Sequence, residues 1–212
     1  MRDRIYLIAF FAILFTFTLN VISVRRNDWV IVKEKVYSSR IIIKYGLFVR
    51  CERSHVVFPL PGDDSNVEWS DYQCRPFPRG KADRCDVHQG FCNAWVAAGY
   101  LTRLSELVAV VALLAIVLGS TIYPTRRGFW KVVAGLTGFH ATLQLVTFWI
   151  IADASDVYTR FDHSYSGAAY AMNTISWVVG SLTTIGFAIA GIAADRGQSW
   201  AAGHAAYQSI SG

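Results

Sequence analysis

The chain has 212 residues, of which 53% are hydrophobic and 14% aromatic, so it is more apolar than soluble domains of this length usually are. Its formal net charge is +5 at pH 7. The basic residues are interleaved with acidic ones and form no block of the kind that follows a phosphate backbone, so we expect no binding to nucleic acid.

Four apolar runs are each long enough to cross a membrane, because a helix of about 20 residues spans a hydrocarbon core of about 30 Å. They predict a mainly α-helical membrane protein built as one tetraspan domain, residues 1–212. The expected parts are spans 5–24, 96–122, 132–152 and 168–194, outer loops 25–95 and 153–167, a cytoplasmic turn 123–131 and a cytoplasmic tail 195–212.

The first run has an alternative interpretation as a cleaved signal peptide. Arg2 and Arg4 precede it, and Val21 and Ser23 lie where a small-residue cleavage motif would be. Its apolar stretch of about 20 residues is longer than the usual h-region of 7 to 15 residues and is rich in Phe, which favours an uncleaved span.

The orientation follows from Lys and Arg in the short connections. The turn 123–131 has three basic residues and no acidic one, whereas 153–167 has three Asp and one Arg. This asymmetry places both termini in the cytoplasm, in a membrane of the secretory pathway that we expect to be the plasma membrane. Arg25 and Arg26 oppose the assignment, but the loop of about 70 residues that they begin should translocate largely regardless of charge.

All four cysteines lie in the loop 25–95. An even number in an expected outer segment indicates two disulfides. Three pairings are possible, and we favour Cys51 with Cys74 and Cys85 with Cys92. A zinc site would require closer Cys pairs with His partners, and a membrane thiol oxidoreductase would require a C-x-x-C motif, so both are less favoured.

The remainder of this loop is typical of β-structure. Segments 28–37, 40–51 and 54–60 are rich in β-branched or aromatic residues and are bounded by Ser, Pro and Gly. Segment 67–77 predicts a further strand, and 61–66 predicts a loop tip. We expect three or four short strands in a small sheet whose order depends largely on the disulfides, because its own core is small.

The same loop contains, in order, the residues of a tetraspan signature: Trp29, Gly46, Leu47, Phe48, Cys51 and Cys74. This order resembles the signature of the PMP22/EMP/claudin superfamily. The span count and the large first loop agree with it, so the resemblance covers the whole topology but few residues.

The resemblance implies a left-handed four-helix bundle that carries a small antiparallel sheet, clamped by a disulfide between Cys51 and Cys74. It also implies that Trp29 and the Gly-Leu-Phe triplet at 46–48 seat the sheet on the bundle. We interpret the segment Tyr45–Cys51 as the end of an extracellular strand. The alternative is that Trp29 only anchors the membrane interface and that Gly46 only ends a strand.

The sequence departs from the claudin pattern at several points. Phe48 stands where claudins usually have Trp, the gap from Cys51 to Cys74 is longer, and the other two cysteines form an added bridge. The tail ends in YQSISG rather than in the hydrophobic residues that claudins offer to PDZ domains. The combination of YGLFVRC, CRPFP, FCNAW and the tail WAAGHAAY resembles uncharacterised claudin-like tetraspans of fungi more than a tight-junction claudin.

Polar residues within the spans are the candidates for transport chemistry. Arg103 and Glu106 are three positions apart near the outer end of the second span, where a structural ion pair is favoured over an ion or substrate pathway. His140 and Gln144 are one turn apart in the third span. Interhelical hydrogen bonding is favoured for them over a proton relay.

Four pairs of small residues are spaced for close helix packing, within the chain or between copies of it: Ala115 with Gly119, Ala134 with Gly138, Thr184 with Ala188, and Gly186 with Ala190. The Asp residues of 153–167, Asp153, Asp156 and Asp162, together with His163, form an acidic turn for which solvation is favoured over cation binding.

The functional expectation is a protein without enzyme activity, cofactor or metal. It would act through contacts with membrane lipids, with itself or with another membrane protein, in adhesion, membrane-domain organisation or escort of a partner. The alternative is a small channel or transporter that uses the polar residues of the spans, and a thiol oxidoreductase is less favoured.

Overall fold

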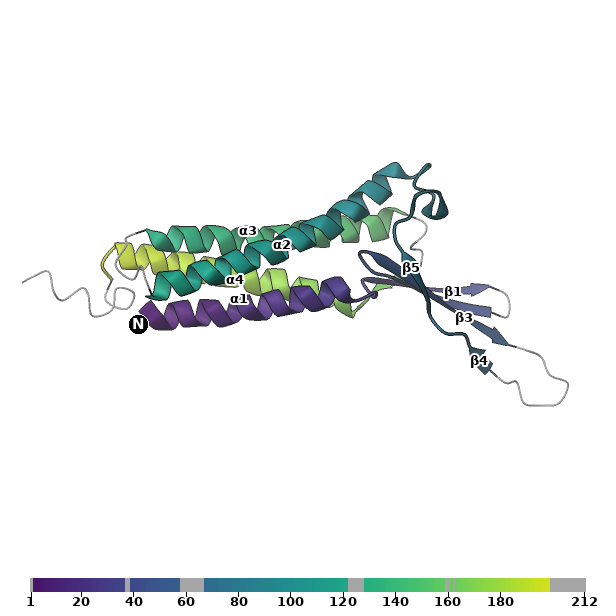
Figure 1. Cartoon of the computed structure of the whole chain (residues 1–212), viewed down its shortest axis with the longest axis horizontal. Coiled ribbons are helices and arrows are strands. Elements are labelled where there is room, and N and C mark those ends of the chain that lie inside the picture. Colours follow the sequence, from purple (N-terminus) through teal and green to yellow (C-terminus); the bar gives the residue numbers. More distant parts are fainter. Residues whose placement is uncertain are drawn as a thin grey trace, which may run out of the picture. The chain divides into compact units, whose positions relative to one another are not determined.

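The computed structural model describes residues 2–36, 39–57, 67–121, 128–158, 161 and 163–198. It is mostly helical, with a small antiparallel sheet (Figure 1). Four helices are long and apolar enough to cross a membrane. They are α1 (Arg2–Arg25), α2 (Gln89–Thr121), α3 (Phe129–Val157) and α4 (Ala168–Asp195).

The helices extend beyond the predicted spans. α2 begins at Gln89 rather than at 96, and α3 ends at Val157 rather than at 152. An apolar run marks the part of a helix that suits hydrocarbon, whereas the backbone hydrogen bonds continue for as long as side-chain packing supports them. The early start of α2 has such support, because Phe91 and Trp95 are buried in its first two turns.

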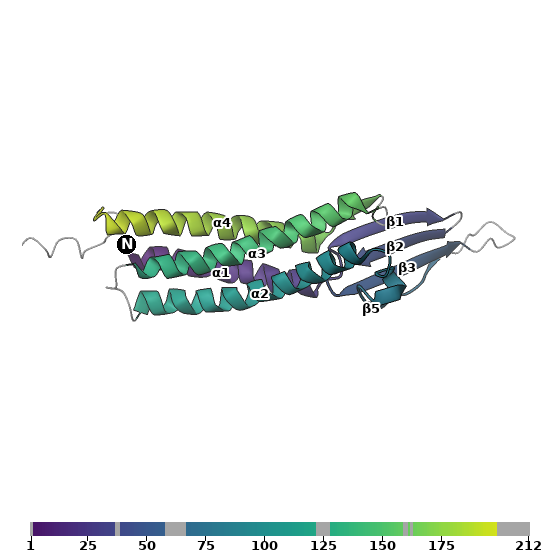
Figure 2. The same cartoon turned by 90° about the horizontal axis from the view of Figure 1, so that it is seen from above.

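The described strands all pair in antiparallel fashion, in the order β4-β3-β2-β1-β6, and β5 also pairs with β3 (Figure 2). They are β1 (Val30–Val36), β2 (Ser39–Tyr45), β3 (Val49–Val57), β4 (Val67–Trp69), β5 (Gln73–Pro76) and β6 (Ser164–Ser166). A short 3₁₀ helix, η1 (Gly80–Asp83), follows β5.

The interpretation of Tyr45–Cys51 as the end of one strand is wrong. This segment is a hairpin: β2 ends at Tyr45, residues 46–48 form the turn, and β3 begins at Val49. The Gly46 N–H donates to the Val49 carbonyl at 2.8 Å, which closes the turn. The run of β-branched residues on both sides concealed the turn, although the glycine at its start is typical of one.

The sheet also has more strands than expected. Segment 67–77 forms two short strands, β4 and β5, instead of one. β6 comes from the second predicted outer loop and pairs with β1, from Val30 with Ser166 to Val32 with Ser164. Three residues are too few to produce a periodic pattern, so the sequence of β6 did not predict a strand.

The chain divides into two compact units, which we describe separately. The first unit comprises residues 1–21, 102–145 and 174–212, and the second comprises 22–101 and 146–173. In the first unit, four helix segments run side by side (Figures 1 and 2). One group of buried apolar residues in this unit consists of Tyr6, Ala9, Ile13, Ala112, Ala115, Ile116, Val133 and Phe187.

Small residues in the first unit let neighbouring groups approach closely. A Cβ added to Gly119 would lie 2.8 Å from the rings of Tyr6 and Phe129, and one added to Gly138 would lie 3.2 Å from a methyl group of Thr184. By contrast, nothing lies within 4 Å of a Cβ added to Gly186. Two of the predicted small-residue pairs therefore include a glycine used for packing within the chain.

The second unit contains the sheet and the adjoining parts of the four helices. Its core is unusually aromatic and includes Trp29, Tyr45, Phe77, Phe91, Trp95 and Phe161. The Trp95 and Phe161 rings stack with their centroids 5.6 Å apart, and Tyr45 meets both Phe77 and Phe161 edge-on. Aromatic pairs of this kind add about 0.5 to 1.5 kcal/mol each beyond simple burial.

Several sequence predictions lie outside the described residues. They are the basic side chains of 123–127, the loop tip 61–66, Arg160 and Asp162 of the acidic turn, and the tail from 199 onward.

Candidate functional site

Trp29 lies in the core of the second unit. Its side chain is fully buried, and its indole N–H donates to the Ser23 carbonyl at 2.9 Å. Its backbone N–H donates to the Tyr45 carbonyl at 2.9 Å. Trp29 therefore connects the end of α1, through its ring, to the β2–β3 hairpin, through its backbone. It is a packing residue of this unit rather than a side chain on its surface.

Gly46 is enclosed by backbone atoms. A Cβ at this position would lie 2.9 Å from the Arg26 carbonyl oxygen, 2.9 Å from the Cα of Asn27 and 3.0 Å from the Val49 carbonyl oxygen. The Gly46 carbonyl also accepts a hydrogen bond from the indole N–H of Trp95 at 3.1 Å. Because backbone atoms cannot move aside as a flexible side chain can, the position accommodates only glycine.

Leu47 and Phe48 attach the same turn to its surroundings. Leu47 is buried. The Phe48 ring packs against Gly99 of α2, where an added Cβ would be 2.9 Å from the ring. Four of the six signature residues, Trp29 and the triplet 46–48, thus lie around one hairpin turn. The Phe48 ring therefore rests on a helix position that has no side chain.

Two disulfides crosslink this unit, in the pairing favoured from the sequence. Cys51 and Cys74 are directly opposite each other on β3 and β5. Cys85 joins Cys92, which lies in the first turn of α2 rather than in a loop because the helix begins at Gln89. The first bond therefore links two strands, and the second fastens the segment after η1 to a long helix.

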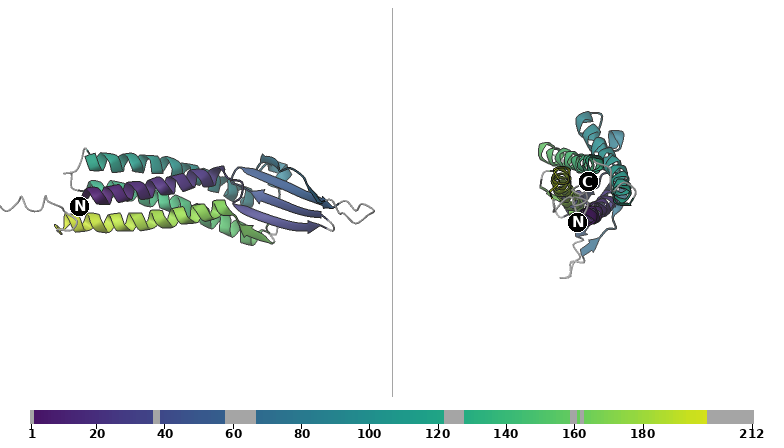
Figure 3. Two further views of the ribbon diagram at one scale, coloured as in Figure 1. Left: turned by 90° about the horizontal axis from the view of Figure 1, so that it is seen from below. Right: turned by 90° about the vertical axis from the view of Figure 1, so that its left-hand side faces the viewer.

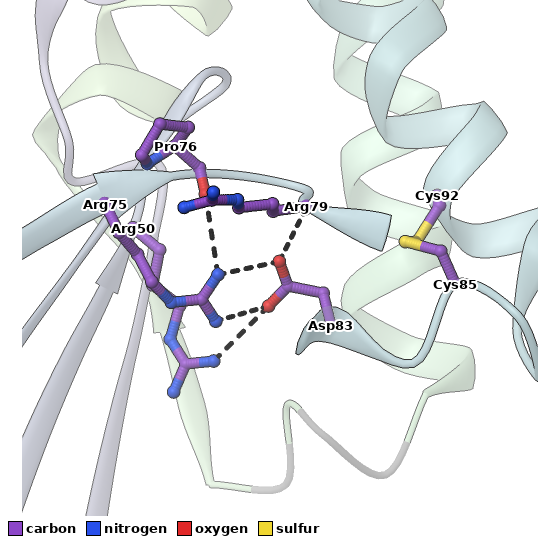
Figure 4. The surroundings of a disulfide bond; sticks show 7 residues. All are labelled: Arg50, Arg75, Pro76, Arg79, Asp83, Cys85 and Cys92. Carbon is purple, nitrogen blue, oxygen red and sulfur yellow. Dashed lines mark hydrogen bonds and ion pairs between the residues drawn. A yellow bond between two sulfur atoms is a disulfide. The ribbon is translucent and has the colours of Figure 1, made fainter. Parts of the chain in front are cut away.

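A buried carboxylate lies close to the second disulfide (Figure 4). Asp83 is 1% exposed and accepts two hydrogen bonds from the Arg75 guanidinium, at 2.8 and 2.5 Å. It also accepts the Arg79 backbone N–H at 2.6 Å, and Arg50 Nη1 lies 3.6 Å away. The bond to Asp83 raises the pKa of Arg75, although burial opposes the shift. One acid thus connects η1 with β3 and β5.

Asp28 occupies the entry to β1. Its carboxylate lies 2.6 Å from the Arg26 guanidinium. Burial tends to raise the pKa of Asp28, but the hydrogen bond and charge of Arg26 outweigh it, with smaller help from the Ala169 backbone and Lys44, so the pKa lies below its usual value. A Cβ at Gly167 would collide with the Asp28 carbonyl oxygen, so glycine allows the chain before α4 to lie against β1.

A separate polar cluster lies in the first unit, around His140. Nδ1 of this histidine lies 2.8 Å from Ser105 Oγ and 3.0 Å from the Ser105 carbonyl, and Nε2 lies 3.1 Å from the Gln144 amide nitrogen. All three residues are fully buried. Because a carbonyl only accepts, Nδ1 carries the proton, and Nε2 accepts from the amide. A neutral imidazole can thus donate to the Ser105 carbonyl and accept from the Gln144 amide.

Other buried polar groups extend this cluster to all four helices. Thr16 of α1 lies 3.4 Å from His140 Nε2, and its carbonyl accepts a hydrogen bond from Ser176 of α4 at 3.0 Å. The Asn20 amide donates weakly to Thr102 and Ser105 of α2. The sequence predicted His140 and Gln144. Isolated Ser, Thr and Asn residues in apolar helices are common, so nothing marked the others in advance.

The remaining predicted residues lie elsewhere. Arg103 is exposed on α2, and Glu106 is half-buried. Asp153 and Asp156 are exposed near the end of α3, and His163 has a left-handed backbone. Within the ranges that the structure describes, no three His, Cys, Asp or Glu side chains are grouped so as to hold a metal ion.

Sequence comparisons do not assign a relative to this chain: no family model matches it, and no curated protein matches it.

Proposed function

We propose that the chain is a four-span membrane protein of claudin-like type, with a left-handed bundle, both termini in the cytoplasm and a place in the plasma membrane. In this proposal it has no enzyme activity. It acts through contacts of its outer sheet and of its helices, in adhesion, in membrane-domain organisation or as the escort of another membrane protein.

The observation that carries the proposal is the arrangement of the signature residues. Trp29 and the turn 46–48 meet in one buried region, and the Cys51–Cys74 disulfide crosslinks the strand that follows the turn. A signature matched by chance has no reason to converge in space. This arrangement supports the proposal, in which the signature residues would position a rigid sheet outside the membrane.

The surface of the helices supports membrane insertion. Large apolar side chains are exposed on each of the four helices. Examples include Ile8 (69%), Leu107 (67%), Trp149 (63%) and Leu182 (65%). Apolar surface on this scale is unfavourable in water, because monomeric soluble proteins rarely expose large contiguous apolar patches. In a bilayer the same side chains would contact lipid tails.

The test is to express Cys51→Ser and Cys74→Ser variants in intact cells and to measure surface delivery and the proteins that co-purify. We expect both variants to lose surface delivery or partner capture, because the sheet would no longer be crosslinked. Thr18→Ser, an exposed change in α1, is the matched control. Normal delivery and normal association in both cysteine variants would contradict the proposal.

The alternative, a small channel or transporter, has one observation in its favour, the buried polar cluster around His140. The hydrogen-bond partners of His140 are hydroxyl groups, an amide and a backbone carbonyl, which suits helix association better than proton transfer. Flux measurements on purified protein in liposomes decide between the two. Transport would require a flux that changes in His140→Leu or Glu106→Gln.

A further inference from the structure

The two faces of the sheet differ in charge. Side chains alternate between the faces along each strand, and directly opposed residues of antiparallel strands share a face. Val30, Val32, Ile43 and Tyr45 are buried on the inner face. The inner face also carries Arg50 of β3 and Arg75 of β5, which Glu52 and Asp83 compensate in ion pairs.

The opposite face, which we call the outer sheet face, is basic. Its described positions on the three long strands include Ile31 and Lys33 of β1, Ile42 and Lys44 of β2, and Arg53 of β3. No described strand position on this face is acidic. In Figure 3 (left) the strands are seen without a helix in front of them, whereas in Figure 2 the beginning of α2 lies in front of them.

Two exposed tyrosines are interleaved with these cations. The Lys33 ammonium lies 4.8 Å from the centre of the Tyr165 ring. The Lys44 ammonium and the Arg53 guanidinium lie 4.7 and 5.4 Å from the centre of the Tyr72 ring. The two rings are 44% and 40% exposed. Each cation is thus held beside a ring by a cation–π contact, and the rings remain partly open to solvent.

The Cys51–Cys74 disulfide supports this arrangement. Cys51 is directly opposite Lys44 on one side and Cys74 on the other. Tyr72 lies two residues before Cys74, so the crosslink holds β5, and the ring next to it, against β3. The disulfide therefore also fixes Tyr72 beside Lys44 and Arg53 on the outer sheet face.

We propose that the outer sheet face binds an acidic, extended segment of a partner protein. Tyrosine and arginine are enriched in protein interfaces, and an apolar centre with a polar rim is their usual anatomy. Here the half-exposed Ile31 and Ile42 form the centre, and the cations surround them. A sugar polyanion would use the cations but would leave the isoleucines without a partner. The inference rests on the proposed function, which places this face outside the membrane.

The dimensions also suit a peptide chain. Neighbouring strands are about 4.8 Å apart, so the three steps from β6 to β3 cover roughly 14 Å. An extended segment rises about 3.3 Å per residue, so about five residues cross the face. Alternate side chains of such a segment point the same way, so acidic and apolar residues that share the every-second positions would face the lysines and the two isoleucines together.

The experiment uses the full chain, purified and reconstituted in lipid nanodiscs. The probe is a short fluorescent peptide with the repeat Glu-Ser-Leu-Ser, whose glutamates and leucines lie on the same side when it is extended, and binding is followed by anisotropy at low and physiological salt. We expect binding that weakens with salt and that falls about tenfold or more in the double variant Lys33→Glu/Lys44→Glu. Lys81→Glu, an exposed change in η1 of the same unit, should leave it unchanged.

Two further variants separate the peptide from other ligands and from misfolding. Ile42→Ser should weaken peptide binding several-fold without changing its salt dependence, and Lys33→Gln/Lys44→Gln should weaken it with both disulfides still formed. The proposal is overturned if the peptide with lysine in place of glutamate binds equally well. It is also overturned if polygalacturonate binds more tightly than the peptide and Ile42→Ser has no effect, since the partner would then be an acidic polysaccharide.

The outcome is independent of the test of the proposed function, because probe binding is measured on purified protein. If surface delivery depends on Cys51 but the probe does not bind, only this inference fails. If the probe binds as expected but the cysteine variants are delivered and associate normally, the proposed function is contradicted. Binding of an acidic peptide by the outer sheet face would then still be supported.

Discussion

Different interactions stabilise the interior of each of the two units of the molecule. The second unit uses two disulfides, a core rich in aromatic rings and a buried Asp83 shared by arginines. The first unit uses small residues, apolar contacts and a few hydrogen bonds around His140. A small sheet has little core and gains stability from crosslinks. A long helix forms its backbone hydrogen bonds internally and requires only weak additional contacts.

The largest effect should come from the disulfides of the second unit. From loop-closure entropy, the crosslink between Cys51 and Cys74, which are 23 positions apart, is worth about 3.5 kcal/mol. The one between Cys85 and Cys92, 7 positions apart, is worth about 2.5 kcal/mol. We expect the double variant Cys51→Ala/Cys74→Ala to lower the free energy of unfolding more than Cys85→Ala/Cys92→Ala. Thermal unfolding with a near-UV probe measures both, and the opposite order would contradict this account.

The turn at Gly46 should be almost as sensitive. Gly46→Ala places a methyl group against the backbone of Arg26 and Asn27, and we expect a loss of about 2 to 3 kcal/mol. Gly186→Ala, in the first unit, meets no atom within 4 Å and is the matched control, with unchanged or slightly increased stability expected. Equal unfolding temperatures of the two alanine variants would contradict the expected difference in stability between them.

Asp83 should rank next. Asp83→Ala leaves Arg75 and Arg50 without their buried partner, which costs about 3 to 5 kcal/mol for a fully buried pair. Because the Arg75 side chain is 31% exposed, water partly replaces the lost interaction, and we expect about 2 kcal/mol. Asp86→Ala changes an exposed acid three residues later and should be nearly neutral. Equal stability of the two variants in chemical denaturation would exclude a structural role for the Asp83 cluster.

The smallest effect should come from the polar cluster of the first unit. His140→Leu removes the contacts with Ser105 and Gln144, and interhelical hydrogen bonds of this kind are worth about 0.6 to 2 kcal/mol in membrane proteins. We expect a loss of about 1 kcal/mol. Phe139→Leu, at the exposed neighbouring position, is the control. A loss as large as that of the Gly46 variant, measured by detergent-induced unfolding, would mean that the cluster organises the whole unit.

The sequence predicted the features that depend on local composition. The four apolar runs appear as helices, and β1 appears where alternation of valines predicted a strand. The disulfides join the cysteines that were favoured as pairs, each with its neighbour along the chain. The hairpin at Gly46 was missed because the β-formers on both sides of the turn resemble one continuous strand.

The rest was decided by tertiary structure. β6 is recognisable only because β1 provides its hydrogen bonds, and Asp83 is important only because Arg50 and Arg75 converge on it from two strands. His140 could be singled out in the sequence, but its hydroxyl partners on α1 and α2 could not. The sequence alone thus determined the apolar helices, whose cause lies within one segment, and it favoured the observed cysteine pairing among three possible ones. The position of the turn, the extra strand, the buried ion pairs and the basic outer sheet face depend on residues distant in the chain, which only packing brings together.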